Sequence, residues 1–437
     1  MTRRLCVLLF LLAGCAAPER ERVRGELRHA WNGYVRYAWG HDELRPLSRT
    51  PRDWYGESLL ITPVDSLDTL ILLGLGEEAA KTREYIDNHL SFDVDVWVKN
   101  FEITIRVLGG LLSAYQLTND PRLLALADDL GRRLSPVFDS PTGMPYRFVN
   151  LRTGAVRGAE SNPAEIGTLI LEFGALARLT GKPAYYDEAK RAVVELYAHR
   201  SRLGLVGSII DVETGAWKDR ASHVGGGIDS YYEYLLKASL LFDDADFRRM
   251  WQESVAAMNA YVADEEPSGL WYGVVDMDSG RRTGTEFGAL EAFLPAVLAL
   301  GGDVARARRL EDSALAMWRQ FGVEPDGYDY VARKATAPSY PLRPEIIESA
   351  VYLAHFANDS SYRALGRRFL DDIDACCRTD AGFANLKSVV TREKDDLMPS
   401  YFIAETLKYL YLLAAPETVD FAQVVFTTEA HPLRRTW

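Results

Sequence analysis

Cysteine and histidine are scarce in this chain of 437 residues, and their spacing excludes several kinds of site. There are four cysteines and seven histidines, with no Cys-x-x-Cys and no His-x-x-x-His spacing among them. We therefore expect neither a zinc centre nor a dithiol redox centre. Because a disulfide between neighbouring residues is strained, the adjacent Cys376 and Cys377 are expected to be unpaired core or half-exposed residues of a helix.

Clustered basic residues and long apolar segments are also missing. The formal net charge is -12, and lysine and arginine form no block longer than a few positions. Nucleic acid is not an expected partner, because phosphate binding requires a clustered positive surface. After the N-terminal segment, no stretch is apolar for long enough to cross a membrane. The hydrophobic content of 48% allows the chain to bury one large core.

The N-terminus has the pattern of an export signal. Two arginines precede an apolar run that is too short to span a bilayer and ends in Leu-Ala-Gly-Cys15, which resembles a bacterial lipobox. We predict that residues 1–14 are a lipoprotein signal peptide, that Cys15 carries the lipid, and that residues 15–21 form a tether. An ordinary signal peptide cut near Ala16 is the alternative. Both patterns predict export, and the first predicts a lipid anchor in a bacterial membrane, at the periplasm or the cell surface.

Helical patterns fill the chain from Glu21 onward. Apolar residues recur at three- and four-residue steps in fourteen segments, which we interpret as seven helical hairpins. Strand-like segments at residues 146–150, 205–210 and 270–275 lie in connections and predict small β-hairpins. The predicted helices span residues 21–39, 64–74, 77–91, 101–117, 121–135, 163–181, 184–199, 228–242, 245–265, 286–300, 304–320, 344–357, 360–377 and 401–415.

Every second helix follows a long connection, and the starts of these helices recur regularly. From residue 101 onward the starts are 57 to 65 residues apart. Two helices per repeat of this length predict hairpins that stack side by side into a closed toroid. The helices after long connections are the more apolar ones, so we place them in an inner ring with their starts at one end. Residues 22–437 are therefore expected to form a single all-α domain.

Acidic residues mark the start of every predicted inner helix. If these starts converge, the carboxylates line one pocket, where mutual repulsion raises their pKa values. Such a cluster usually serves catalysis, a cation or both. Asp65 and Asp68 are equally interpreted as helix caps, Glu286 is expected to be structural, and Glu233 is expected to brace the ring through Lys237. The acids at the starts are Asp65, Asp68, Glu102, Glu165, Asp229, Glu286, Glu345 and Glu405.

Two of the starts carry further charged groups. Glu102 lies one turn before Arg106, so that a carboxylate and a guanidinium share the mouth of a buried helix, although a local ion pair would explain this equally well. Glu345 and Glu348 share one face of a helix whose beginning is fixed by Pro344.

The C-terminal segment 420–432 is apolar and strand-like and ends in hydroxyl and acidic side chains. After a closed toroid, such a segment would plug the barrel and carry Thr428 and Glu429 toward the acids. A strand packed on the outer surface is the alternative.

Five motifs resemble the signature blocks of glycoside hydrolase family 47, the class I α-mannosidases. They are FEITIRVLGGLLSAY at 101–115, DSYYEYLLK at 229–237, LRPEIIES at 342–349, AETLKYLYLL at 404–413 and FTTEAHP at 426–432. The resemblance implies an (α/α)7 barrel, dependence on calcium (Ca2+), and inverting hydrolysis of terminal α-1,2-linked mannose. It implies an α-1,2-linked mannose-containing oligosaccharide as the substrate, and we expect a monomer.

The resemblance also implies roles for individual residues. Glu102 matches the general acid, Glu345 the general base and Asp229 the remaining catalytic carboxylate. Thr428 matches the threonine that binds calcium through its carbonyl and hydroxyl oxygens. An inverting glycosidase needs one protonated and one ionised carboxyl roughly 6.5–9.5 Å apart, and a hard dication allows many acids to share one pocket. The implied substrate-binding residues are Arg106, Glu165, Arg343, Glu348, Tyr401, Glu405 and Glu429.

The chain departs from the family at positions that bear on specificity. Gly288 and Ala289 stand where eukaryotic members commonly carry Asp-His, and Tyr401 stands where phenylalanine is usual. The metal block reads Phe-Thr-Thr instead of Phe-Asn-Thr but keeps Thr428, and the widely spaced disulfide of many eukaryotic members is missing. Preference for large N-glycans is therefore not expected to carry over, and short α-1,2-mannosides are expected to suffice.

Two other functions compete with this one. A calcium-dependent, lectin-like mannose-binding protein would keep the barrel without turnover, but the presence of every candidate acid argues against it. An epimerase or lyase on a similar toroid would be expected to have histidines in the acid ring, which this ring lacks.

Overall fold

The computed structural model describes residues 3–435, with side chains from Pro18 onward. The predicted signal peptide and the lipid-carrying Cys15 fall on residues 1–17, whose side chains lie outside the described part, so this prediction stays untested. Among the described residues, no helix combines the length and the apolar character needed to span a bilayer.

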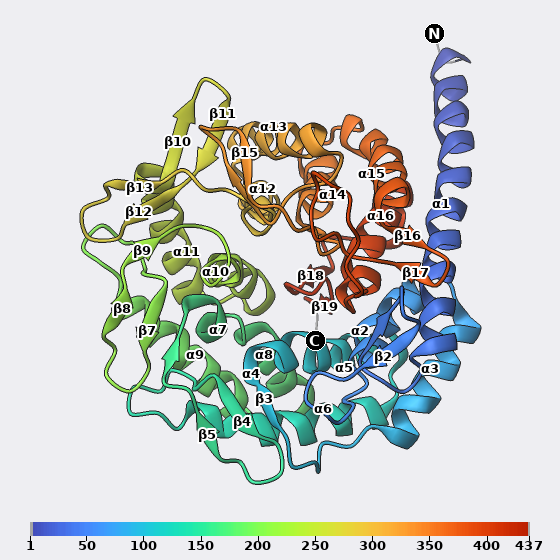
Figure 1. Cartoon of the computed structure of the whole chain (residues 1–437). Helices are drawn as coiled ribbons and strands as arrows, with labels where there is room; N and C mark the ends of the chain where they lie inside the picture. Colours follow the sequence, from blue (N-terminus) through green and yellow to red (C-terminus); the bar gives the residue numbers. More distant parts are fainter. Residues whose placement is uncertain (1–2, 436–437) are drawn as a thin grey trace.

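Two concentric rings of helices form a barrel (Figure 1). Each inner helix packs against an outer helix next to it in the chain, and the last inner helix packs against the first outer one, so the ring closes and the predicted (α/α)7 barrel is confirmed. The inner ring contains α2 (Ile61–Leu72), α4 (Asn100–Ile103), η1 (Thr104–Leu108), α5 (Gly109–Thr118), α7 (Pro163–Gly167), α8 (Ile170–Thr180), α10 (Asp229–Phe242), η4 (Leu290–Phe293), α12 (Leu294–Leu300), α14 (Glu345–Phe356), η5 (Phe402–Thr406) and α16 (Leu407–Ala414). The outer ring contains α1 (Arg3–Tyr37), α3 (Gly76–His89), α6 (Pro121–Leu134), α9 (Ala184–Ala198), α11 (Ala245–Ala257), α13 (Val304–Phe321) and α15 (Ser361–Cys377).

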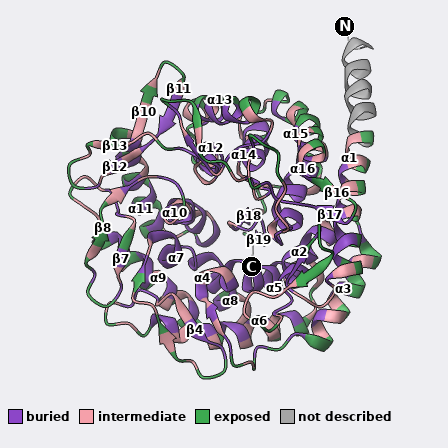
Figure 2. Ribbon diagram, in the orientation of Figure 1, coloured by how far each residue is buried: buried purple, intermediate pink, exposed green. Residues whose placement is uncertain are grey.

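Burial separates the two rings (Figure 2). In the inner helix α14, every residue from Ile346 to Ala354 is buried. The outer helix α13 buries one face, on which Ala307, Leu310 and Ala314 recur at three- and four-residue steps. Inner helices that are buried on all sides therefore form the core, and amphipathic outer helices cover them.

Small antiparallel sheets of two or three strands occupy the long connections. The three predicted strand segments correspond to β4 (Phe148–Asn150), to β7 (Ile209–Asp211), and to β11 (Gly269–Tyr272) with β12 (Val274–Asp276). Several sheets join one connection to the next, because β3 pairs with β4, β6 with β7, and β9 with β12. The other strands here are β1 (Glu43–Arg45), β2 (Thr50–Arg52), β3 (Trp97–Lys99), β5 (Val156–Arg157), β6 (Glu160–Ser161), β8 (Trp217–Asp219), β9 (Ala221–Ser222), β10 (Ala263–Glu266), β13 (Arg282–Gly284), β14 (Gly327–Asp329), β15 (Lys334–Ala337), β16 (Arg378–Thr379) and β17 (Gly382–Phe383).

The C-terminal segment forms a hairpin of β18 (Val424–Phe426) and β19 (Pro432–Arg434). Strand β18 contacts α10 and β19 contacts α5, so the hairpin lies within the inner ring, near the centre of Figure 1. The predicted plug is therefore confirmed, and packing on the outer surface is wrong.

Several predicted helix boundaries are wrong, and the helix predicted from residue 21 is part of α1, which begins at Arg3. Helix α11 continues through the π-turn η3 (Met258–Val262), but residues 263–266 form β10 and pair with β11, so the helix predicted to residue 265 ends earlier. The helix predicted from residue 286 begins at Leu290. Before it, the backbone of Gly288 lies so close to the Asp326 carbonyl that a Cβ would be 1.9 Å from its oxygen, which keeps this segment extended against β14.

The adjacent cysteines lie at the end of α15 and are both unpaired. Cys377 is buried and Cys376 is half-buried. Their prediction as free helix residues is confirmed.

Candidate active site

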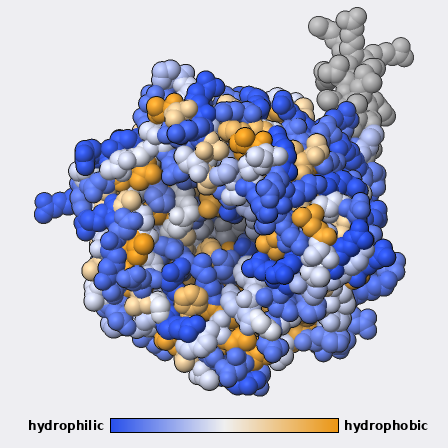
Figure 3. Space-filling model, in the orientation of Figure 1, coloured by the Kyte–Doolittle hydropathy of each residue, from blue (hydrophilic) through white to orange (hydrophobic). Residues whose placement is uncertain are grey.

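A cavity of about 460 Å³ lies at the end of the barrel where the inner helices begin. In Figure 3 this face is hollowed near its centre and surrounded mainly by hydrophilic residues. The structure brings together all of the residues predicted for the site on the wall of this one cavity: Glu102, Arg106, Glu165, Asp229, Arg343, Glu345, Glu348, Tyr401, Glu405, Thr428 and Glu429.

Accessibility divides these carboxylates into two groups. Glu102, Asp229 and Glu345 are half-buried and face the cavity. The other four acids, Glu165, Glu348, Glu405 and Glu429, lie deeper and keep only 4–6% of their surface. The three carboxylates predicted to be catalytic are therefore the ones that a substrate can reach directly.

Glu102 and Arg106 form an ion pair at the start of an inner helix. Arg106 Nη2 lies 3.1 Å from Glu102 Oε2, and Lys99 Nζ lies 3.4 Å from Glu102 Oε1. Glu102 thus contacts two cations, one on each carboxylate oxygen. Arg106 lies on the π-turn η1, an irregularity that often occurs at functional sites.

Arg106 also reaches the C-terminal hairpin. Its Nη1 atom lies 2.6 Å from Glu429 Oε1, and its guanidinium carbon lies 5.4 Å from the ring centres of both Trp54 and Tyr401. Although burial opposes the charge, Glu429 and Glu102 raise the pKa of Arg106 well above its usual range. A permanent cation therefore joins the first turn of one inner helix to the plug.

Asp229 and Glu345 lie where protonation is favoured. Burial raises the pKa of Asp229 to about 7, and the nearby carboxylates of Glu233 and Glu291 add to this effect. Its Oδ1 atom accepts a hydrogen bond of 2.7 Å from the Ser230 amide. Burial also raises the pKa of Glu345 to about 8, against the opposing effect of Arg343.

Three hydroxyl groups hold the loop before Glu345. Leu342 has a left-handed backbone (φ 61°), which is costly for a branched residue. The Tyr401 hydroxyl donates to the Pro341 carbonyl at 2.6 Å, and Thr406 Oγ1 donates to the Leu342 carbonyl at 2.8 Å. The Tyr340 hydroxyl donates to the next carbonyl, that of Arg343, at 3.3 Å. Successive hydrogen bonds thus fix the approach to α14.

Arg343 and Glu348 are held by groups outside the cavity. Arg343 Nε donates to Asp326 Oδ1 at 3.0 Å, and Glu348 Oε1 accepts from the Tyr409 hydroxyl at 3.1 Å. Lys237 forms a buried ion pair with Glu233, so the predicted brace is present, and Glu233 also lines the cavity.

The acids near Thr428 carry more potential negative charge than their neighbours neutralise. Burial raises the pKa of Glu348 and of Glu429 to about 8, and that of Glu405 well above its usual range. One oxygen each of Glu345 and Glu429 is buried without a hydrogen-bond partner. This chemistry suits a hard dication with oxygen ligands.

The described acidic side chains are not arranged to coordinate one metal ion directly. Within residues 18–435, no three acidic, histidine or cysteine side chains are grouped closely enough to bind a metal together.

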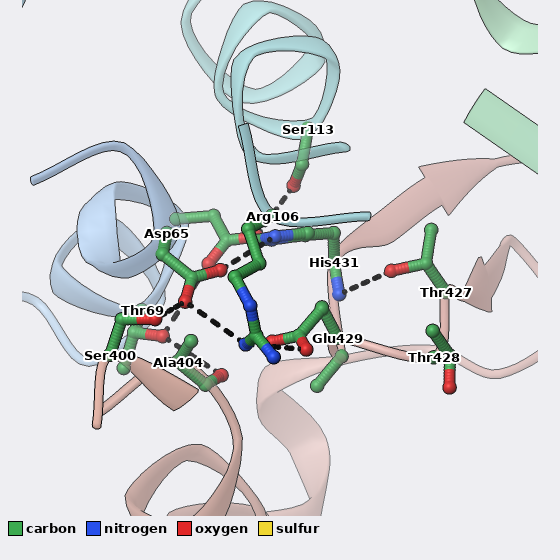
Figure 4. Close-up of polar contacts among 12 residues, drawn as sticks. Asp65, Thr69, Arg106, Ser113, Ser400, Ala404, Thr427, Thr428, Glu429 and His431 are labelled. Atoms are coloured by element: carbon green, nitrogen blue, oxygen red, sulfur yellow. Dashed lines mark hydrogen bonds and ion pairs between the residues drawn. The ribbon is translucent and has the colours of Figure 1, made fainter. Parts of the chain in front are cut away.

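A buried ionic network joins the plug to the inner helices, and Figure 4 shows the part of it around Asp65 and His431. His431 Nδ1 lies 2.7 Å from Asp68 Oδ2, and His431 Nε2 lies 3.2 Å from Asp65 Oδ1. Lys408 Nζ lies 2.9 Å from Asp68 and also donates to the Ala430 carbonyl at 2.6 Å. In Figure 4 the Thr428 hydroxyl points away from His431, so the network leaves this hydroxyl free for another partner.

The interpretation of Asp65 and Asp68 as helix caps is wrong. Helix α2 begins at Ile61, and neither acid caps it. Glu286 is exposed, bonds to Thr336 and lies outside the cavity wall, as expected of a structural residue.

Three residues around the site, Arg147, Lys99 and Glu291, were not predicted from the sequence. Glu165 is bound by Arg147 through two hydrogen bonds of 2.7 and 3.0 Å, and Lys99 Nζ lies 2.9 Å away. Although burial opposes ionisation, these cations lower the pKa of Glu165. Glu291 is half-buried beside Gly225 and accepts from the Gly288 amide at 2.8 Å. Of these residues, only Lys99 could have been predicted from the sequence, because it lies three residues before Glu102.

A helical barrel whose inner helices gather several carboxylates in one accessible cavity has the acid and base groups that a glycoside hydrolase requires. The profile described as glycosyl hydrolase family 47 matches residues 26–435, and the chain belongs to this family. Alpha-mannosidase I MNS5 from Arabidopsis thaliana is 38% identical, with 95% of this chain and 77% of that protein covered. The human mannosyl-oligosaccharide 1,2-alpha-mannosidase IB is 35% identical, with 95% of this chain and 69% of that protein covered. These relatives are eukaryotic, and the bacterial origin stays a prediction.

Solved structures agree on the fold. The alpha-1,2-mannosidase from Trichoderma reesei superposes with a TM-score of 0.87 at 27% identity, covering 96% of this chain and 99% of that one. The cellobiose 2-epimerase from Spirochaeta thermophila DSM 6192 shares only the fold, with a TM-score of 0.63 at 9% identity, covering 93% of this chain and 99% of that one. In the described part of the chain, no histidine lines the cavity. His431 is fully buried and contacts Asp65. An epimerase with histidines in its acid ring therefore finds no support.

Proposed function

We propose that the chain is a calcium-dependent, inverting exo-α-1,2-mannosidase that removes terminal α-1,2-linked mannose from oligosaccharides. The observation that carries this proposal is the convergence of Glu102, Asp229 and Glu345 on one cavity next to Thr428. The relatives named as mannosidases, which match nearly the whole chain, support the choice of sugar and linkage.

Glu102 is the residue that the family resemblance matches to the general acid, but the surroundings favour Asp229 as the proton donor. Asp229 lies among carboxylates and holds its proton near neutral pH, which suits a group that protonates the leaving oxygen. Glu102 is paired with Arg106 and Lys99, so it fits a role in positioning a water or the leaving hydroxyl on the acid side. Glu345 begins the inner helix α14, where it would take a proton from the attacking water.

Calcium fits this acid ring. Thr428 would hold the ion through its carbonyl and hydroxyl oxygens, with Glu348, Glu405 and Glu429 reaching it through water. A bound dication supplies positive charge that orients sugar hydroxyls and lowers the pKa of nearby groups. Glu345 has a raised pKa and one oxygen without a hydrogen-bond partner. A bound dication nearby would lower this pKa and favour the ionised form that a base requires.

Hydrolysis of α-1,2-mannobiose, followed by NMR, tests the proposal. The purified protein should release β-mannose first, and a chelator should stop the reaction until calcium is restored. Release of the α-anomer would overturn inversion, and turnover unaffected by chelator would overturn the calcium site. Binding without any cleavage would favour the lectin-like alternative.

We also propose that the protein is exported as a monomer with a lipid on Cys15. The lipobox-like Leu-Ala-Gly-Cys15 supports this. In a bacterial host, wild type should incorporate labelled palmitate and partition into detergent, whereas Cys15→Ala should do neither. Equal labelling of both proteins would overturn the anchor.

A further inference from the structure

The sheet β3-β4-β5 beside the cavity has two unlike faces. Val98 and Val149 are opposite each other in the register and are fully buried, so one face packs on the core. Side chains alternate along each strand, which places Trp97, Phe148 and Arg157 on the other face. Trp97 and Phe148 are half-buried and Arg157 is exposed. We call these three residues the rim platform.

The rim platform is continuous with the cavity. Lys99 lies two residues after Trp97 on the same strand and pairs directly with Phe148, which in turn pairs with Arg157. The Lys99 ammonium lies on the cavity wall, where it contacts Glu102 and Glu165. Arg147 also binds Glu165 and lies 5.8 Å from the Phe148 ring centre. A sugar chain that leaves the cavity past Lys99 therefore meets the platform.

The platform offers both ring surface and free hydrogen-bond donors. Arg157 Cζ lies 4.1 Å from the ring centre of Trp97 and 5.6 Å from that of Phe148. In the described residues no carboxylate pairs with Arg157, unlike Arg147 and Lys99, which are neutralised. Gly158 has a positive φ of 85° and packs under Phe148, where a Cβ would be only 3.0 Å from the ring, so the ring is held in place.

We propose that the rim platform is a subsite for the sugar residues beyond the one released as the leaving group. This inference rests on the proposed function. An apolar sugar face would lie against the aromatic and guanidinium planes, while hydroxyls accept hydrogen bonds from the Arg157 N–H groups. A disaccharide ends before the platform, and a trisaccharide or longer α-1,2-mannoside reaches it. The enzyme therefore turns over the trisaccharide and longer α-1,2-mannosides more efficiently than the disaccharide.

Turnover of α-1,2-mannobiose and α-1,2-mannotriose by Arg157→Ala tests the subsite. We expect kcat/KM for the trisaccharide to fall about tenfold, chiefly through KM, with the disaccharide unchanged within about twofold. The matched control is Arg152→Ala, because Arg152 is exposed at the β4–β5 turn of the same sheet and contacts Asp93 instead of the platform. Trp97→Phe should show a smaller effect in the same direction as Arg157→Ala.

The possible results distinguish failure of the subsite proposal from failure of the proposed function. Equal changes for both substrates in Arg157→Ala, or no change for either, would overturn the subsite. Absence of turnover in wild type would overturn the proposed function instead. In that case calorimetric titration with mannotriose still decides the subsite, since Arg157→Ala must bind it more weakly than wild type and Arg152→Ala do.

Discussion

His431 Nδ1 lies 2.7 Å from Asp68 Oδ2, although Asp68 is on the first inner helix and His431 is in the C-terminal hairpin. Both side chains are fully buried. Although burial opposes the charge, Asp68 and the hydrogen bond to Asp65 raise the pKa of His431 to about 9. Lys408 and His431 lower the pKa of Asp68 to about 2. The turn that carries Thr428 and Glu429 is thus fastened to the barrel by buried charges.

His431→Gln should destabilise the protein by roughly 3 kcal/mol at about pH 6, because the buried carboxylates of Asp65 and Asp68 lose the imidazolium cation. The folded-state pKa lies above the unfolded value, so this stabilisation is complete below about pH 6.5 and is lost as the pH rises through about 9. Urea unfolding of both proteins at several pH values measures it. His89→Gln is the control, since that histidine is exposed, and a destabilisation that does not shrink at high pH would contradict the imidazolium.

Glu345→Gln should lower kcat about 10²–10⁴-fold while calcium and substrate still bind, because the amide keeps the shape but cannot accept the proton. Kinetics and calorimetric titration provide the two measurements. Glu286→Gln, an exposed glutamate outside the cavity wall, should behave as wild type. Near-normal turnover of Glu345→Gln would reassign the base.

Thr428→Val should weaken calcium binding by about one to two orders of magnitude, because it removes one hydroxyl ligand and leaves the hairpin backbone intact. Activity followed during titration with a calcium buffer gives the midpoint. Thr283→Val, on an exposed part of β13, is the control. An unchanged calcium midpoint in Thr428→Val would show that the metal is bound elsewhere.

Glu291→Gln should shift the pH profile of kcat/KM. Asp229 must be protonated to act as an acid, so kcat/KM should fall as the pH rises through its pKa of about 7. The Glu291 carboxylate raises that pKa, and removing its charge moves the descending limb to lower pH. The profiles of Glu291→Gln and Glu286→Gln are compared, and a limb that stays in place would mean that Asp229 does not set it.

Tyr401→Phe should lower the free energy of unfolding by about 1 kcal/mol, because the Pro341 carbonyl loses its hydroxyl donor. Turnover should stay within a few-fold, since the ring remains in the cavity wall. Urea unfolding and kinetics measure the two effects. Tyr261→Phe, at an exposed tyrosine, should leave both unchanged. A loss of activity greater than the loss of stability would show that the hydroxyl acts on substrate.

The helical repeat could be predicted from the sequence because, in this fold, the spacing of apolar residues matches the faces that are buried. Inner helices such as α14 are mostly apolar and outer helices such as α13 are amphipathic, so the two rings differ in the sequence itself. The regular spacing of the acidic starts then placed the carboxylates at one end. The exception is Glu286, where close backbone contact between Gly288 and Asp326 delays the helix.

Periodicity by itself determined the seven hairpins and the ring of acids, because both depend on spacing along the chain, whereas the tertiary structure decided that the C-terminal segment plugs the barrel. Only the tertiary structure decided which charges meet. His431 reaches Asp65 and Asp68, and Arg147 reaches Glu165, across distances in sequence that no pattern encodes. Burial then sets the proton affinities, since the cost of a charge depends on everything packed around it.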